Sequence, residues 1–247
     1  MSVVRLGVAC EDNGHFSAVT RLVDDTLLAE HQWLDGILDA CRSWHGCAAA
    51  QCWYKYNPDD ANDLRPILLD GQRIAPNGHI NGAPLKPEAG MWRRILLLFC
   101  HVDPRPDVVL LARDLDGDPR RRAGIEQVRD GLPWPFKIAV ATPQPEIEAW
   151  LVAGFAPDGA AEHARLQACR QRLSFDPTTQ SERLTSHPND ATTDAKRVLD
   201  DLCGADRERV ARCLTDRTLL RQRGRSNGLA EFLGDIDRFI VPTFDRP

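Results

Sequence analysis

Apolar and polar residues alternate along the first 155 residues in patterns that predict strands and helices in turn. Short apolar runs bounded by turn-forming residues predict strands, and these runs cover residues 3–10, 48–56, 107–112 and 136–141. Apolar residues repeated every three or four positions predict helices, and these repeats cover residues 16–28, 32–44, 91–101, 120–130 and 146–154. The alternation favours an α/β fold with a mostly parallel sheet flanked by helices over residues 1–155.

The remainder of the chain follows a different pattern. Residues 156–247 are predicted to form a C-terminal helical region, with helical repeats at residues 160–173, 191–203, 206–214 and 229–239. Inside the α/β part, an insertion at about residues 30–90 separates the first helix from the strand at residues 107–112. Its centre, residues 57–87, is rich in Pro, Gly, Asn and Asp and is predicted to be a long loop with a short apolar break at residues 67–69.

Composition limits the classes of protein that fit the chain. The 247 residues carry a formal net charge of −5, which argues against a generally basic surface for nucleic acid but leaves local basic patches open. The longest apolar run, residues 95–100, is far shorter than a membrane span requires, and residues 1–14 lack the pattern of a secretion signal. We therefore expect a cytoplasmic protein with no membrane partner. A homo-oligomer is one of the assembly states that the sequence leaves open.

Acidic residues follow three of the predicted strands. Glu11 comes after the first strand, Asp114 and Asp116 after the third, and Glu146 and Glu148 after the fourth. Functional groups of parallel α/β sheets gather beyond the carboxyl ends of the strands, so we expect these side chains to converge. Converging carboxylates repel one another unless a cation neutralises them, and oxygen ligands are those that Mg²⁺ prefers. The sequence therefore predicts a site for Mg²⁺ or Mn²⁺ with all five as ligands.

These acidic positions, in this order, resemble those of a Toprim domain. This metal-binding fold is shared by topoisomerases, bacterial primases, small ribonucleases and the overcoming-lysogenization-defect nucleases. The resemblance covers about residues 3–155 and includes the stretch PEIEAWLVAG at residues 145–154. It implies a Mg²⁺-dependent nuclease that hydrolyses phosphodiester bonds in DNA or RNA, of the small stand-alone type that occurs in bacterial defence loci.

The resemblance also implies roles for single residues. Glu11 corresponds to the Toprim glutamate, which acts as a metal ligand or as a general acid/base. Asp114 and Asp116 correspond to the metal-binding aspartate pair. Glu148, with Glu146 as the second choice, corresponds to the further acidic position of the nuclease-type members. Glu11, Asp114, Asp116 and Glu148 are thus the predicted catalytic residues.

Basic residues flank the predicted metal site. Arg113, Arg120 and Arg121 lie beside the aspartates, and Lys137 begins the fourth strand. Guanidinium and ammonium groups at such places would contact the phosphates of a nucleic acid. A second basic stretch lies at residues 217–225, and both stretches also fit solvated surfaces.

Other functions remain open. The chain contains no Walker loop, so a nucleotide-driven step would need an ATPase partner protein, and the domain could be a non-catalytic or partner-dependent subunit of a defence complex. A haloacid-dehalogenase-like phosphotransferase also uses a DxDG motif, but here the motif lies deep in the chain, Asp118 replaces the usual threonine and Glu11 is left unexplained. A calcium loop that begins at Asp114 fails, because Pro119 and Ile125 stand where that loop needs Gly and Glu.

A further group of residue types could bind zinc. Cys41, His45, Cys47 and Cys52 are close in sequence but do not form paired CxxC motifs. Small residues surround them, so we expect these cysteines to be free thiols that pack as small hydrophobic side chains. His15, which follows Gly14, could lie at the mouth of the cleft, but a single histidine is more often structural or solvated, and we expect the latter.

Overall fold

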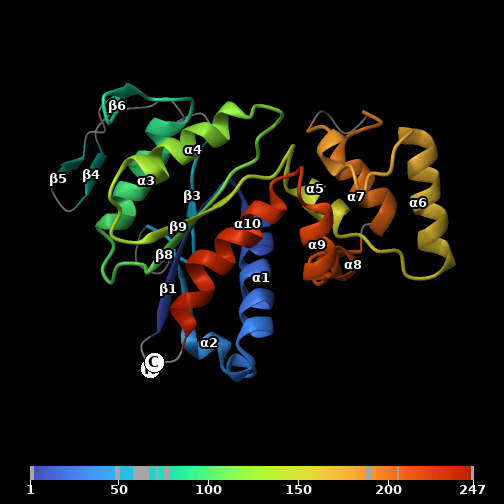
Figure 1. The fold of residues 1–247 in the computed structure, drawn as a ribbon, viewed down its shortest axis with the longest axis horizontal. Helices are drawn as coiled ribbons and strands as arrows, with labels where there is room; N and C mark the ends of the chain where they lie inside the picture. The colour runs from blue at the N-terminus through green and yellow to red at the C-terminus, as the bar shows by residue number, and fades with distance from the viewer. Residues whose placement is uncertain are drawn as a thin grey trace.

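A computed structural model shows the fold (Figure 1). It describes residues 3–47, 51–57, 67–69, 72–74, 78–186, 191–204 and 206–245. No helix among these residues has the length and apolar character that crossing a bilayer requires.

A five-stranded parallel sheet forms the centre of the molecule. Four strands lie in the order β2 (Arg42–His45), β1 (Val4–Cys10), β8 (Val108–Ala112) and β9 (Lys137–Ala141), and β3 (Tyr54–Lys55) also pairs with β1. All of these pairings are parallel, so the carboxyl ends of β1, β3, β8 and β9 lie at the same edge. Every residue of β8 is buried, as expected for an apolar strand covered on both faces.

Helices cover both faces of the sheet (Figure 1). On one face, α1 (Asn13–Glu30) and α5 (Ile147–Ala153) pack with α10 (Leu229–Asp235). On the other face lie α3 (Ala89–Cys100) and α4 (Arg120–Gly131). The two faces have separate cores because successive residues of a strand point to opposite sides of the sheet.

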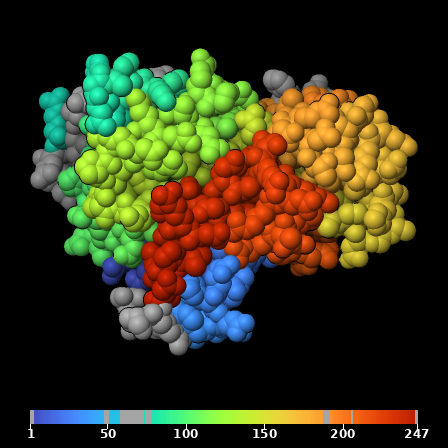
Figure 2. Space-filling model, in the orientation of Figure 1, coloured from blue at the N-terminus to red at the C-terminus, as the bar shows by residue number. Residues whose placement is uncertain are grey.

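The helices after residue 155 divide between two cores. The first set packs on Val152 and Phe155 and forms its own core. It consists of α6 (Ala160–Leu173), η3 (Ser181–Arg183), α7 (Ala195–Cys203) and α8 (Arg207–Arg212). The chain then returns to the sheet, and its side chains join the core that contains β1 and α1. This returning part consists of α9 (Arg217–Arg223), α10, η4 (Ile236–Ile240) and η5 (Val241–Phe244). Figure 2 shows it as a red band across one face of the molecule.

The fold class predicted from the sequence is confirmed: a mainly parallel sheet flanked by helices precedes a C-terminal helical region. The predicted strands at residues 3–10, 107–112 and 136–141 correspond to β1, β8 and β9. The loop predicted at residues 57–87 contains two short antiparallel pairs in its described part. These pairs are β4 (Ile67–Leu69) with β5 (Gln72–Ile74), and β6 (His79–Ile80) with β7 (Ala83–Pro84).

One prediction about local structure is wrong, and one helix was not predicted. The helix predicted at residues 32–44 is a 3₁₀ turn, η1 (Gln32–Leu34), then a four-residue helix, α2 (Leu38–Cys41), and finally strand β2. Gly36 has a φ of 71°, which ends the helical path, and pairing with β1 then draws the next residues into the sheet. The basic stretch at residues 217–223, for which no element was predicted, is helix α9. Of the strand predicted at residues 48–56, only β3 forms within the described part of this range, and residues 48–50 lie outside the description.

Candidate metal site at the carboxyl edge of the sheet

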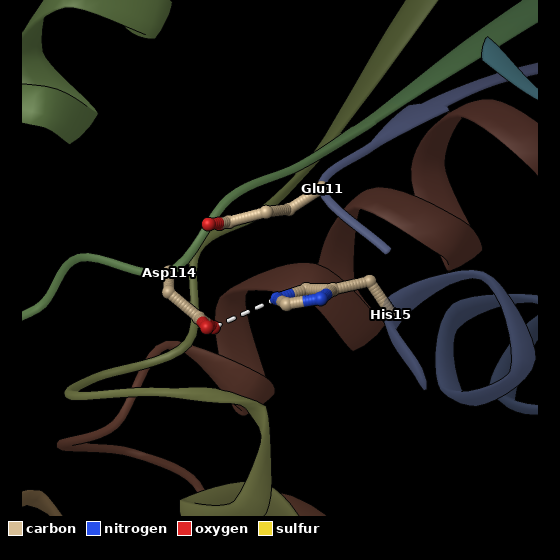
Figure 3. Close-up of side chains that lie close together, drawn as sticks. All are labelled: Glu11, His15 and Asp114. Carbon is tan, nitrogen blue, oxygen red and sulfur yellow. Dashed lines mark hydrogen bonds and ion pairs between the residues drawn. The ribbon is translucent and has the colours of Figure 1, made fainter. Parts of the chain in front are cut away.

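Three side chains from separate positions in the sequence meet at the carboxyl edge of the sheet. Glu11 directly follows β1, His15 lies in the first turn of α1, and Asp114 follows β8 by two residues. Each offers one ligand atom, and these atoms lie within 4.8 Å of one another (Figure 3). The parallel pairing of β1 with β8 brings them together, because it places the ends of both strands side by side.

The local sequence fixes the position of His15. Asp12 is the N-cap of α1, and its side chain accepts a hydrogen bond from the backbone N–H of His15. The imidazole ring is buried between two aspartates, with Nδ1 2.9 Å from Oδ1 of Asp12 and Nε2 2.8 Å from Oδ1 of Asp114. Burial disfavours the imidazolium, but the hydrogen bonds to Asp114 and Asp12 raise the pKa of His15 to about 10. His15 is therefore a cation at neutral pH, and it must lose a proton before it can bind a metal ion.

Two glutamates that follow β9 lie near Asp114. Glu146 is the N-cap residue of α5 and is 3% exposed, and Glu148 lies in the first turn of that helix. Burial and the charge of Glu148 raise the pKa of Glu146 to about 7, and Asp114 adds to this effect. Burial also raises the pKa of Glu148, and Asp114 adds to it again. The negative charge of Asp114 therefore acts on both glutamates.

Oxygen atoms of these glutamates are left without hydrogen bonds. Oε2 of Glu146 lies 3.3 Å from Nζ of Lys196, a residue of α7. In contrast, Oε1 of Glu146 and Oε2 of Glu148 are buried and have no partner among the described residues. An unsatisfied buried carboxylate oxygen is costly, and these two oxygens are acceptors for which the described residues provide no donor.

Buried arginine side chains neutralise another part of the acidic edge. Arg113 is 3% exposed, with Nη1 2.6 Å from Oε2 of Glu11 and Nη2 3.0 Å from Oε1 of Glu88. Burial disfavours its charge, but the hydrogen bonds to Glu88 and the nearby negative charges raise the pKa of Arg113. Arg121 contacts Glu88 at 3.3 Å and forms an ion pair with Asp116. Arg113 and Arg121 are therefore held by carboxylates from three segments of the chain.

The predicted acidic residues separate into two groups. Glu11 and Asp114 belong to the three-residue group, and Glu146 and Glu148 lie close enough to interact with Asp114. Asp116 is not part of that group. Its backbone has a φ of 46°, and its carboxylate faces Arg121 and lies 3.9 Å from Nη1 of Arg113.

The predicted phosphate-binding residues lie in different places. Arg113 is buried in ion pairs, whereas Arg120 is exposed and pairs with Asp118. Arg121 lies next to Asp114 and donates a hydrogen bond to its carbonyl oxygen. Lys137 is exposed at the amino end of β9, opposite to the end that Glu146 follows. The structure therefore does not bring Lys137 to the acidic edge.

Sequence reasoning missed three residues of this edge. His15 was expected to be structural or solvated, although its spacing of four residues from Glu11 and three from the helix cap Asp12 could have placed it at the site. Glu88 and Lys196 come from a loop and from the C-terminal helices, so no local sequence pattern connects them with Glu11.

The four residues of the cysteine cluster are not gathered in the way that metal ligands are. Among the residues that the structure describes, Glu11, His15 and Asp114 are the only group of three or more side chains suited to a metal ion. All eight cysteines are free thiols, with Cys41 buried in the core and Cys52 exposed. The expectation that these cysteines are free thiols is therefore confirmed.

Comparisons of the chain with protein-family models, with curated proteins and with solved structures find no match. The chemistry of the site must therefore be inferred from its own residues.

Proposed function

We propose that this protein is a metal-dependent phosphodiester hydrolase of the Toprim-like nuclease type, which acts on DNA or RNA. The observation that carries the proposal is the meeting of Glu11, His15 and Asp114 at the ends of β1 and β8. Buried oxygens of Glu146 and Glu148, which follow β9, have no partner among the described residues and add to it. Carboxylate oxygens are the ligand atoms that suit Mg²⁺ or Mn²⁺.

The balance of charge supports a bound cation. Seven carboxylates gather at this edge, contributed by Glu11, Asp12, Glu88, Asp114, Asp116, Glu146 and Glu148. Five cationic side chains contact or lie near them: His15, Lys55, Arg113, Arg121 and Lys196. The surplus of negative charge can be relieved by protonation, which the raised pKa of Glu146 indicates, or by a divalent cation.

In hydrolysis, the residues of this site would have three roles: they would hold the metal ion, orient its ligands and bind the phosphates of the substrate. Asp114, Glu11 and the free oxygens of Glu146 and Glu148 would hold the ion, which in hydrolases of this kind activates a water molecule and stabilises the leaving oxygen. Arg113 orients Glu11 through their hydrogen bond, and His15 orients Asp114 in the same way. Arg120, which is exposed and pairs with Asp118, would contact the phosphates of a substrate.

We extend the proposal to the setting of the protein on the resemblance alone. A stand-alone Toprim-like nuclease fits a role in antiviral defence in the bacterial cytoplasm. The absence of a Walker loop from the sequence means that any ATP-driven step would depend on a partner protein.

A cleavage assay tests the central claim. The wild-type chain is incubated with single- and double-stranded DNA and RNA in Mg²⁺ or Mn²⁺, with a chelator in parallel. We expect Asp114→Asn to lower the rate by more than about 100-fold, since loss of a ligand should exceed the effect of losing a residue that only supports one. Asp130→Asn, on the exposed surface of α4, is the matched control and should cleave as the wild type does. Equal rates for Asp114→Asn and the wild type would contradict the proposal.

One observation favours a second function, that of a partner-dependent or non-catalytic subunit. His15 as a cation and Arg113 already neutralise Asp114 and Glu11 without any metal ion. If the cluster is purely structural, titration calorimetry will detect no binding of Mn²⁺ by the wild type at neutral pH. Binding that Asp114→Asn weakens would instead support the hydrolase.

A further inference from the structure

A cleft opens directly beside the acidic edge, on the side of β3. It has a volume of about 530 Å³ and is lined by Glu11, Asp12, Lys55, Tyr56 and Asn57. Strand pairing explains this position, because Lys55 is in register with Cys10, the residue before Glu11. The buried ring of Tyr56 is fixed by a hydrogen bond from its hydroxyl to the carbonyl oxygen of Ala112. Tyr56 is therefore a fixed part of the cleft wall, and the cleft lies next to Glu11 of the candidate metal site.

Lys55 differs from the other cations of this edge. Arg113, Arg121 and Lys196 all form ion pairs with carboxylates. Lys55 is exposed and forms no ion pair with any residue that the structure describes. It can therefore bind a new anion without the loss of an existing pair.

The two acidic residues of the cleft do not cancel this charge. Glu11 is paired with Arg113, and Asp12 is paired with His15. Oδ1 of Asp12 lies 2.9 Å from Nδ1 of His15, so this carboxylate already has a partner within the protein. Among the described residues, Lys55 is the cation of this cleft that no carboxylate pairs with, and its ammonium group can contact a phosphate oxygen.

The cleft also continues away from the acidic edge. A second, smaller cleft shares Tyr56 and Asn57 with it and extends to Tyr54, Met91 and Arg94. This second cleft has a volume of only about 50 Å³, so the main cleft is the part that can hold a ligand of nucleotide size. The main cleft is of the size that holds a group like one nucleotide, and this size favours a single strand over a duplex.

We propose that Lys55 binds the phosphate next to the scissile one, and that the cleft along β3 holds one flanking nucleotide of a single-stranded nucleic acid. The identity of the ligand rests on the proposed function, whereas the site itself rests on the position and the charge of Lys55.

Binding measured without cleavage tests the subsite. A fluorescent oligonucleotide, as single-stranded DNA and as RNA, is titrated with the full-length chain in the presence of a chelator. We expect Lys55→Gln to raise the Kd about tenfold, as for loss of one charge-assisted hydrogen bond. The slope of log K against log salt should also fall by about 0.7, the value for one phosphate contact on a single strand. Lys55→Arg should retain most of the affinity.

Two comparisons make the outcome decisive. Lys137→Gln removes an exposed lysine at the amino end of β9 and should bind as the wild type does, and both glutamine variants should show the thermal midpoint of the wild type. The subsite is refuted if Lys55→Gln binds with wild-type affinity, or if the wild type binds no single strand. Lys55-dependent binding without cleavage in Mg²⁺ or Mn²⁺ would refute the hydrolase and leave the subsite standing.

Discussion

Single buried charges determine the arrangement of the acidic edge. Glu88 has a φ of 62°, lies 7% exposed and contacts both Arg113 and Arg121. A buried carboxylate of this kind is retained where it compensates buried cations, and here one of those cations orients Glu11. The sequence predicted the residues at the strand ends because a strand and its polar end are local features. It did not predict Glu88 or Lys196, because their roles depend on contacts between distant segments.

Removal of the Glu88 charge should destabilise the protein. In Glu88→Gln, Arg113 and Arg121 lose a buried counter-ion, and we expect the free energy of unfolding to fall by about 3 kcal/mol. Urea denaturation measures this change. Glu126→Gln is the control, because Glu126 forms a more exposed pair with Arg122 and its loss should cost about 0.5 kcal/mol. If the two variants are destabilised equally, the buried Glu88 carboxylate contributes no more to stability than the more exposed pair of Glu126 and Arg122.

At the scale of elements, the sequence pattern predicts helices and strands correctly unless contacts with distant segments favour another structure. The apolar run of β8 and the helical repeat of α3 are strong local signals, and both elements form where they were predicted. The helix predicted at residues 32–44 did not form, because Gly36 has a φ of 71° and β1 offers a free edge for pairing. Periodicity alone cannot weigh a helical repeat against pairing with a distant strand.

Glycine in a helix offers a test of such packing. In α4, a Cβ atom at Gly124 would lie 1.9 Å from the carbonyl oxygen of Pro87, whereas in α10 a Cβ at Gly234 would meet nothing within 4 Å. Alanine improves helix propensity at both positions by about 1 kcal/mol. At Gly124, however, the new Cβ would push the backbone of Pro87 away, and the free-energy cost of this movement exceeds the gain in propensity. We expect Gly124→Ala to lower the free energy of unfolding by about 2 kcal/mol and Gly234→Ala to raise it by about 0.5 to 1 kcal/mol in urea denaturation. Changes of the same sign in both variants would contradict this account of the contact between α4 and the segment before α3.

At the scale of the whole molecule, the C-terminal helices are joined to the sheet and to the acidic edge. The indole N–H of Trp150 donates to the carbonyl oxygen of Asn227, and the backbone N–H of Val140 donates to Asp235. Helix α7 supplies Lys196 to Glu146. Only the helical nature of this region could be predicted from the sequence. Its contacts with the site could not, because they join residues separated by 50 or more positions in the chain.

The pair of Glu162 and Arg209 links α6 to α8 and should make the stability of the molecule depend on pH. The atoms Oε1 of Glu162 and Nε of Arg209 are 2.7 Å apart, and both residues are buried. The hydrogen bonds from Arg209 lower the pKa of Glu162 to about 2, below the ordinary value of 4.5. A carboxylate whose pKa is lower in the folded state contributes stability above its unfolded pKa, and this contribution is lost as the pH falls towards the folded pKa. The Glu162 contribution should therefore be complete at neutral pH and should disappear between pH 4.5 and about 2.

We expect Glu162→Gln to lower the free energy of unfolding by about 3 kcal/mol at neutral pH, because it leaves the Arg209 guanidinium buried without its counter-ion. The difference between the variant and the wild type should shrink as the pH is lowered, since protonation removes the same charge from the wild type. Urea denaturation of both proteins at about pH 7 and about pH 3 measures the two differences. Glu208→Gln, at an exposed position of α8, has no ion pair among the described residues and should show a small effect that does not change with pH. A Glu162→Gln effect of the same size at both pH values would show that packing, rather than the charge of this pair, holds α6 against α8.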